Sequence, residues 1–223
     1  MNTDTHLLRR SRMVERLKSA GISNQAVLAA MLKVPRHLFV EDIFYRHAYD
    51  DLSLPLPAGQ TISQPYIVAR MSELLCSPHT GFPQKVLEIG TGCGYQTAVL
   101  ESIGIGEIYS IERIKKLHDI ARNNLQHGDF YRAKLIYGDG YAGLPTFAPF
   151  DGIILTAAPP QIPLPLLRQL TIGGRMVLPL GDEYQQFLYL IEKTEKGYRE
   201  TCLERVNFVP MLGGKTQVSS EAI

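Results

Sequence analysis

The sequence predicts an α/β fold built on a mostly parallel sheet with helices on both faces. From Lys85 onward, strand-like segments alternate with helix-like segments, which is the pattern of parallel strands joined by helical crossovers. A glycine-rich turn follows the first of these strands, and the last two strand-like segments have no helix between them. At 223 residues with 45% apolar content, the chain can bury a substantial core, and we predict a single domain.

The first third of the chain should form a helical cap followed by a long loop. Apolar spacing predicts helices over residues 14–21 and 23–33, and Pro35 would end the second. Residues 42–65 are rich in Pro, Gly, Ser and Asp and are predicted to be irregular, whereas a helical pattern returns over 66–76. A long irregular loop in a compact domain is usually functional.

The alternating part of the chain defines the predicted sheet. Strands are expected near 85–90, 107–112, 133–137, 150–157 and 174–180, and helices near 95–104, 114–127 and 163–171. A closing antiparallel hairpin should pair 187–192 with 200–209 around a polar turn at 194–197. Within the single domain, 1–80 would supply the N-terminal helices and loop, 81–193 the core, and 194–223 the last strand and tail.

Charge and hydropathy narrow the class of protein. The net charge of +1 gives no field of one sign, so we expect neither nucleic acid nor a membrane surface as a partner. No apolar run approaches the length of a membrane span, and the N-terminus lacks the apolar stretch of a secretory signal. We therefore expect a cytoplasmic monomer. The basic run over residues 9–12 is predicted to be a solvated face or a frayed end.

A glycine-rich turn is the most informative motif of the chain. The apolar run that begins at Val86 breaks at Gly90, Gly92 and Gly94, which allow positive φ and close approach of a ligand to a helix N-terminus. A dinucleotide fingerprint counted from Gly90 needs a further glycine at position 95, where this chain has Tyr95. The spacing favours a nucleoside cofactor that has no pyrophosphate.

Carboxylates at successive strand ends add to this prediction. Glu88 lies beside the glycine turn, Glu112 could accept from ribose hydroxyls, and Asp139 could receive an adenine amino group. Each alone would be an ordinary loop carboxylate, but the ordered set resembles the S-adenosylmethionine site of class I methyltransferases, which have a Rossmann-like fold. The resemblance implies cofactor contacts from Thr61, Ile62, Glu88, Gly90, Thr91, Gly92, Gly94, Glu112, Arg113, Asp139 and Gly140.

Other segments bear on the acceptor of the methyl group. The chain resembles the protein-L-isoaspartate (D-aspartate) O-methyltransferase family from about residue 12 to 214, most specifically at Gly59-Gln60-Thr61-Ile62-Ser63-Gln64-Pro65. Further matching blocks are 86–97, 138–140, 148–151, 156–159, 173–175, 179–181 and 208–210. The order of these blocks is far more specific than a glycine turn alone.

The resemblance implies methyl esterification of the free carboxyl group of L-isoaspartyl and D-aspartyl residues in damaged proteins, which starts their repair. By the same resemblance Ser63 is the active-site residue, and Ser63, Gln64 and Val209 bind the substrate. A carboxylate is already ionised at neutral pH, so no catalytic base is needed and catalysis would rest on positioning. Ser63 would orient the carboxylate rather than act as a nucleophile.

Alternative interpretations remain for single residues. Ser63 could instead cap the helix at Pro65, and Val209 could be an ordinary buried strand residue. Asn207 stands where many bacterial members of the family carry arginine, so we expect an altered peptide preference. Cys93 is interpreted as a small packing residue, since three scattered cysteines form neither a disulfide framework nor a metal knuckle.

Other functional classes are also open. An NAD-dependent oxidoreductase would share the strand and glycine turn, but Tyr95 disfavours it. A non-catalytic reader of damaged proteins would have no need of the cofactor residues, and a methyltransferase for a small carboxylic acid would have no need of the 61–63 block. The six histidines show no metal-ligand pairing, so we predict no metal, which disfavours catechol-type methyltransferases.

Overall fold

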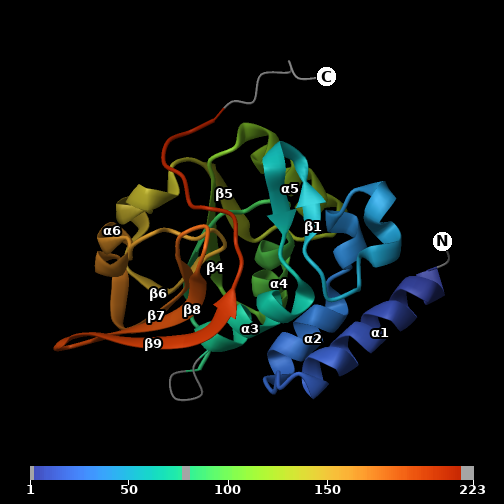
Figure 1. Cartoon of the computed structure of the whole chain (residues 1–223), viewed down its shortest axis with the longest axis horizontal. Coiled ribbons are helices and arrows are strands. Elements are labelled where there is room, and N and C mark those ends of the chain that lie inside the picture. Colours follow the sequence, from blue (N-terminus) through green and yellow to red (C-terminus); the bar gives the residue numbers. More distant parts are fainter. Residues whose placement is uncertain (1–2, 77–80, 217–223) are drawn as a thin grey trace.

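The computed structural model describes residues 3–76 and 81–216, and a seven-stranded sheet lies at its centre (Figure 1). The strands are β3 (Lys85–Ile89), β4 (Glu107–Glu112), β5 (Ala133–Tyr137), β6 (Phe150–Leu155), β7 (Leu170–Gly181), β8 (Gln186–Thr194) and β9 (Gly197–Val206). Their spatial order is β5-β4-β3-β6-β7-β8-β9. The first five are parallel and the last two pair antiparallel, which confirms the predicted mixed sheet.

The strand order determines where a ligand can bind. The chain runs outward from β3 to β4 and β5, and then returns to place β6 on the other side of β3. The loops that follow β3 and β6 therefore leave the sheet in opposite directions and open a crevice at the carboxyl ends of these strands.

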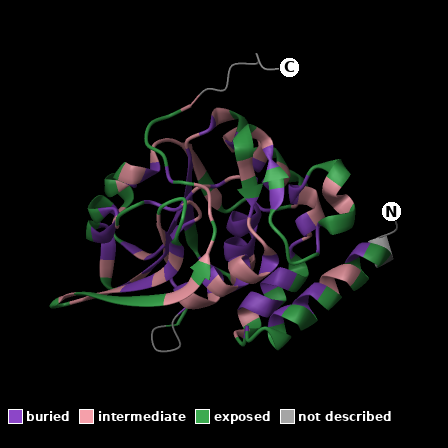
Figure 2. Cartoon of the chain, viewed as in Figure 1, coloured by how far each residue is buried: buried purple, intermediate pink, exposed green. Residues whose placement is uncertain are grey.

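Helices on both faces bury the sheet, as predicted. One face packs against α3 (Pro65–Leu75) and α4 (Tyr95–Ile103), with α5 (Lys115–His127) beside α4. The other face packs against the short helix α6 (Leu164–Arg168) and the turns around it. Side chains alternate between the two faces, so that Val86 joins the first core and Leu87 the second, and Figure 2 shows the buried residues concentrated along these strands.

The N-terminal cap differs from its prediction in length. Helix α1 (Thr3–Ser19) runs about three turns further toward the N-terminus than expected, beside α2 (Gln25–Lys33). The basic run lies inside α1, and it is neither frayed nor merely solvated. Arg9 and Arg10 donate to the backbone carbonyls of Arg46 and Lys33 at 3.0 and 2.8 Å. These bonds hold the N-terminal half of α1 against the rest of the cap.

Residues 42–65 are more regular than predicted. They contain a 3-10 helix (Asp42–His47) and a small hairpin of β1 (Leu54–Leu56) and β2 (Gln60–Ile62), and another 3-10 helix (Arg36–Phe39) precedes them. Leu54 pairs with Ile62 and both are buried. The strands are three residues long and β1 has a proline at its centre, so the sequence shows no readable alternation here.

Several element ends also differ from the prediction, as at β6, which ends at Leu155, and at β7, which begins at Leu170. Helix α6 stops at Arg168 because β7 already begins at Leu170, where the helix was predicted to continue. Strand β9 stops at Val206 and not at 209, because the backbone of Phe208 bonds to the side chain of Gln186. Over the described ranges, no helix is long and apolar enough to cross a membrane.

Candidate active site

Three connected depressions meet at the carboxyl end of the sheet. The central cavity, about 650 Å³, is lined by Gln60, Thr61, Ile89, Gly90, Gly92, Ile111, Glu112, Arg113, Ile114, Leu117, Gly140, Thr156, Ala157, Val209, Pro210, Met211 and Leu212. The inner cavity is lined by residues of 61–63, 90–93 and their neighbours, and the outer groove by Ser53, Ser63, Gln64, Ile67 and residues 205–209. Thr61 and Thr156 line all three, so the depressions adjoin at these two side chains.

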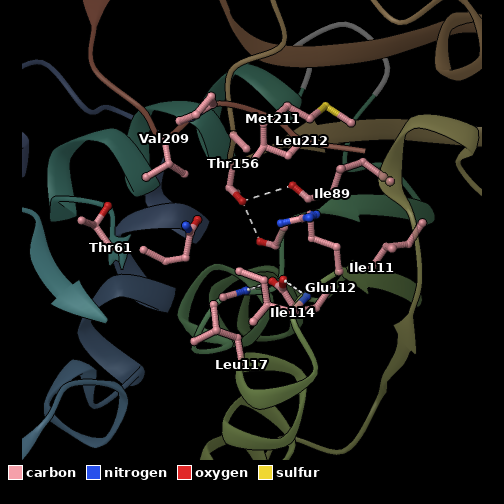
Figure 3. Close-up of a pocket in the computed structure, with 17 residues that line it drawn as sticks. Thr61, Ile89, Ile111, Glu112, Ile114, Leu117, Thr156, Val209, Met211 and Leu212 are labelled. Carbon is pink, nitrogen blue, oxygen red and sulfur yellow. Dashed lines mark hydrogen bonds between the residues drawn. The ribbon is translucent and has the colours of Figure 1, made fainter. Parts of the chain in front are cut away.

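Figure 3 shows how the central cavity is built. Thr61 and Val209 lie on one side of it, Ile111 lies on the other, and Thr156 stands between them. Ile89, Ile111, Ile114 and Leu117 form apolar walls, and the carboxylate of Glu112 supplies charge. Apolar walls that carry a few polar groups are typical of a site for a small organic molecule such as a nucleoside.

Gly90 is required by the packing of the loop. It has φ +98°, and a Cβ atom there would lie 2.3 Å from Oγ1 of Thr156. That hydroxyl donates to the carbonyls of Ile89 and Gly90 at 3.1 and 2.6 Å, so it cannot turn away without losing both bonds. Thr156 therefore fixes the glycine turn to the end of β6.

Glu88 does not line any of the three depressions, which corrects the expectation that it contacts the cofactor directly. It is fully buried, and its Oε2 accepts from the hydroxyls of Thr97 and Ser110. The Ser110 hydroxyl also bonds to that of Thr91 at 2.6 Å. Burial raises the pKa of Glu88 to about 7. Glu88 therefore ties the glycine turn to β4 and α4 from below.

Glu112 is the carboxylate that faces the central cavity. Its two oxygens accept from the backbone N–H groups of Gly92 and Ile114 at 2.9 and 2.8 Å, which holds the carboxylate across the two loops (Figure 3). Burial raises its pKa, and the same backbone donors oppose that shift. Each oxygen keeps acceptor capacity, which suits a diol such as that of a ribose.

Arg113 and Asp139 are joined by the C-terminal segment. Arg113 donates to the carbonyl of Gly214 at 3.1 Å and to Oγ1 of Thr216 at 2.6 Å, while Oδ2 of Asp139 accepts from the N–H of Gly214 at 2.6 Å. Arg113 lines the central cavity, and Asp139 lies behind Gly140, which does line it. The segment therefore closes the cavity between the ends of β4 and β5.

The remaining predicted cofactor residues, apart from Gly94, line the central or the inner cavity. Thr61 lines the central cavity with Gly90 and Gly92, whereas Ile62 and Thr91 line the inner cavity. Gly94 lines neither: it precedes the first residue of α4, where a Cβ would press against Leu125 at 3.1 Å. Its role is to let α5 pack closely on the loop.

Ser63 lies between the inner cavity and the outer groove. It follows β2 directly and lines both depressions, while Gln64 lines the groove. The helix that begins at Pro65 has Gln64 as its first flanking residue and no side-chain cap, so the alternative of a capping serine is wrong. The hydroxyl of Ser63 has no hydrogen-bond partner among the described residues, and it is available to a substrate.

A glutamine holds the opposite wall of the outer groove. The amide of Gln186 is buried; its Oε1 accepts from the N–H of Phe208 at 2.7 Å and its Nε2 donates to the carbonyl of Phe208 at 3.1 Å. Next to it, the carbonyl of Val209 accepts from Ala158 at 2.8 Å. Val209 is half-buried and lines both the central cavity and the groove, and its pairing with a substrate stays a prediction.

Sequence reasoning missed Thr156 and Gln186 as functional residues. Thr156 belongs to one of the family-like blocks, but its contact with Gly90 depends on the return of β6 to the side of β3. The apolar walls of the central cavity were also missed, because an isoleucine near a strand end looks like any core residue. Strand order was the signal that could have identified Thr156.

Cys93 is a packing residue, as interpreted. It is buried, and this burial raises the pKa of its thiol to about 11, so it stays protonated and poorly nucleophilic. Within the described part of the chain, no three His, Cys, Asp or Glu side chains gather in a way that could hold a metal ion.

Comparison with known proteins gives the family. The model of the protein-L-isoaspartate(D-aspartate) O-methyltransferase family matches residues 8–216. A protein-L-isoaspartate O-methyltransferase of Chromobacterium violaceum is 57% identical over 206 residues, which cover 92% of this chain and 91% of the relative. One of Methylobacillus flagellatus is 54% identical over 210 residues and 92% of each chain.

Solved structures agree with this result. A protein-L-isoaspartate O-methyltransferase has 28% identity and a TM-score of 0.81, over 92% of this chain and 66% of that longer chain. A Plasmodium falciparum structure of the same description, in complex with S-adenosyl-L-homocysteine, has 24% identity and a TM-score of 0.77 over 91% of this chain and 98% of its own, and it supports the fold. The chain belongs to the protein-L-isoaspartate(D-aspartate) O-methyltransferase family.

Proposed function

We propose that this protein is an S-adenosylmethionine-dependent enzyme that methylates the free carboxyl group of L-isoaspartyl and D-aspartyl residues in damaged proteins and peptides. The family and its close relatives support this activity. The single observation that carries it in the structure is the junction at Thr61 and Thr156, where the central cavity adjoins the outer groove. A nucleoside cofactor and a peptide could thus meet there from opposite sides.

The residues of the central cavity fit the cofactor. When bound, S-adenosylmethionine supplies an electrophilic methyl group on its sulfonium. Glu112 would accept from the ribose hydroxyls, and the absence of a Cβ at Gly140 lets the loop after β5 pack closely on Ile89, whose side chain would lie 2.4 Å from a Cβ there. The apolar side chains of Ile111 and Met211 would pack against the adenine, and Asp139, which lies behind Gly140 and already accepts from Tyr141 and Gly214, would act at the adenine edge only through its remaining acceptor capacity.

The groove would orient the substrate carboxylate. A carboxylate with an ordinary pKa near 4 is ionised at neutral pH, so the protein needs no base to activate it. The unpartnered hydroxyl of Ser63 would donate to one carboxylate oxygen and direct the other toward the junction. Proximity and exclusion of water would then supply most of the rate enhancement. The backbone of Val209 would pair with the extended peptide and so accept varied sequences.

The direct test uses methyl-labelled S-adenosylmethionine and two peptides that differ only in one residue, L-isoaspartate or L-aspartate. We expect base-labile methyl ester on the isoaspartyl peptide alone. Label on neither peptide, in a protein that binds S-adenosylhomocysteine by calorimetry, would reject the acceptor and leave the cofactor assignment standing. Label on both peptides equally would reject the specificity.

The proposal extends to the setting of the enzyme. We propose a cytoplasmic monomer whose partners are isoaspartyl proteins and peptides, without nucleic acid or membrane, since the net charge of +1 offers neither a strong field. Light scattering after size exclusion should give one chain mass. A stable dimer mass would overturn the oligomeric part.

A further inference from the structure

A cation stands at the far end of the outer groove. Arg205, near the end of β9, lines the groove together with Ser63 and Asn207. It also lines a shallower depression beyond, with Glu183 and Tyr184 of the turn between β7 and β8. Among the described residues that line the outer groove, Arg205 is the only one with a charge.

The guanidinium of Arg205 is lightly engaged. Within the described residues its side chain makes one hydrogen bond, to the carbonyl of Tyr184 at a long 3.4 Å, and it is exposed. An arginine has five N–H donors, so most of them face solvent or a ligand. No ion pair joins Arg205 to a carboxylate in the ranges that the structure describes.

Two carboxylates of the described residues lie near Arg205 in the sequence or in the adjoining depression, and neither lines the outer groove. Glu204 is held by Arg70 at 3.2 Å, and Arg70 is further paired with Glu73 at 3.5 Å. Glu183 lines only the shallow depression beyond the groove. The outer groove therefore carries an uncompensated positive charge on the side where a peptide bound at Ser63 would continue.

We propose that Arg205 determines substrate specificity by binding an acidic side chain close in sequence to the isoaspartyl residue. This inference rests on the proposed function and adds to it a preference among flanking sequences. A guanidinium binds a carboxylate in a planar two-bond arrangement, which a lysine or an amide cannot match. Asn207, on the same face of the extended segment two residues further on, is neutral and does not compete for the acid.

The test measures methylation of a set of isoaspartyl peptides that carry Glu, Gln or Lys at one of the two positions on either side. At low ionic strength we expect KM to rise in the order Glu, Gln, Lys at one of these positions, with about a threefold to fivefold step for an exposed ion pair. The order should disappear in R205Q, and added salt should weaken it in the wild type.

R199Q is the matched control. Arg199 lies on the same strand and is exposed, and R199Q removes the same charge about 20 Å further along the strand. It should retain the order of KM. An unchanged order in R205Q, an equal loss in R199Q, or no order in the wild type would overturn the inference while methylation continues. Absence of methylation on every isoaspartyl peptide would instead overturn the proposed function itself.

Discussion

The two sides of the junction are held by different kinds of structure. On the side of the central cavity, Glu88, Thr91 and Glu112 are buried. Their hydrogen bonds join the glycine turn to β4. On the side of the outer groove, Thr61 and Arg205 are exposed, and the hydroxyl of Ser63 has no hydrogen-bond partner within residues 3–76 and 81–216. The central cavity is suited to one ligand of constant shape, and the outer groove is suited to peptides of varied sequence.

This difference predicts separable effects. Changes beneath the glycine turn should act on the cofactor and on every substrate alike, because the buried bonds fix one geometry. Changes along the groove should act on peptides and leave cofactor affinity intact. A groove mutation that lowers the affinity for the cofactor would show that the two sides are not independent.

The largest effect should come from G90A. The new methyl group would collide with Thr156 Oγ1 at 2.3 Å in a residue whose φ already disfavours a side chain. We expect the affinity for S-adenosylhomocysteine, measured by calorimetry, to fall at least about tenfold, which is about 1.4 kcal/mol.

G104A is the control for G90A. Gly104 has a similar φ of +104°, but a Cβ there meets nothing within 4 Å. It should lose some stability through backbone strain and keep cofactor affinity. Equal losses of affinity in the two variants would mean that strain alone, and not the packing on Thr156, explains G90A.

S63A should have the next largest effect, and it tests whether a change in the groove leaves the affinity for the cofactor intact. Loss of a hydrogen bond to a charged group costs about 1.5–3 kcal/mol, so kcat/KM for the isoaspartyl peptide should fall at least about tenfold. Calorimetry should find the affinity for S-adenosylhomocysteine unchanged. A parallel fall in cofactor affinity would contradict the separation of the two sides.

Q186L should produce a smaller change, confined to the peptide. It leaves the N–H and carbonyl of Phe208 without their partner, so the wall at Val209 loosens and KM for peptide should rise severalfold, or about 1 kcal/mol. Cofactor affinity should hold.

Q169L is a matched control on the other face of the sheet. Gln169 is also buried and also clamps a loop backbone, accepting from Leu144 and donating to Ala142, both at 2.8 Å. Both variants should lose a similar free energy of unfolding, but only Q186L should raise the peptide KM. A rise in both would reduce the effect to general destabilisation.

The smallest effect on activity is expected from E88Q. This substitution should instead change how the free energy of unfolding depends on pH. The folded pKa of Glu88 is raised to about 7, above the value of 4.5 for a free glutamate, so the folded state holds its proton more tightly. The free energy of unfolding should therefore fall as pH rises from about 4.5 to about 7, by about 3 kcal/mol at most.

E88Q keeps the shape but cannot ionise, so this component of the pH dependence should vanish. Urea unfolding at about pH 5 and about pH 8 measures it, with wild type and variant compared at each pH. The same slope in both proteins would mean that Glu88 does not titrate in this range, and that its burial is compensated in another way.

The sequence predicted the cofactor side better than the groove, for a physical reason. The glycine turn, Glu112 and the strands that carry them are local patterns of periodicity and spacing, which can be read without knowing the fold. Thr156 and Gln186 act through contacts over 66 and 22 residues of sequence separation, and no local pattern reveals such contacts.

The groove and the N-terminal cap were also hard to predict from local sequence patterns. The hairpin of β1 and β2 is too short and too rich in proline to show alternation, and α1 began earlier than expected because its arginines bond across the cap. The 61–63 block was found only through resemblance to a family. In this region backbone groups and single polar side chains make the important contacts, and the hydrophobic pattern of the sequence does not reveal such contacts.

The most direct test of the account is a crystal structure with S-adenosylhomocysteine and an isoaspartyl peptide bound together. We expect the ribose at Glu112, the peptide in the groove along residues 205–209, and the free α-carboxylate of its isoaspartyl residue within hydrogen-bond reach of Ser63 Oγ, at the junction of Thr61 and Thr156. A carboxylate bound away from Ser63, or a peptide that enters through the central cavity, would contradict it.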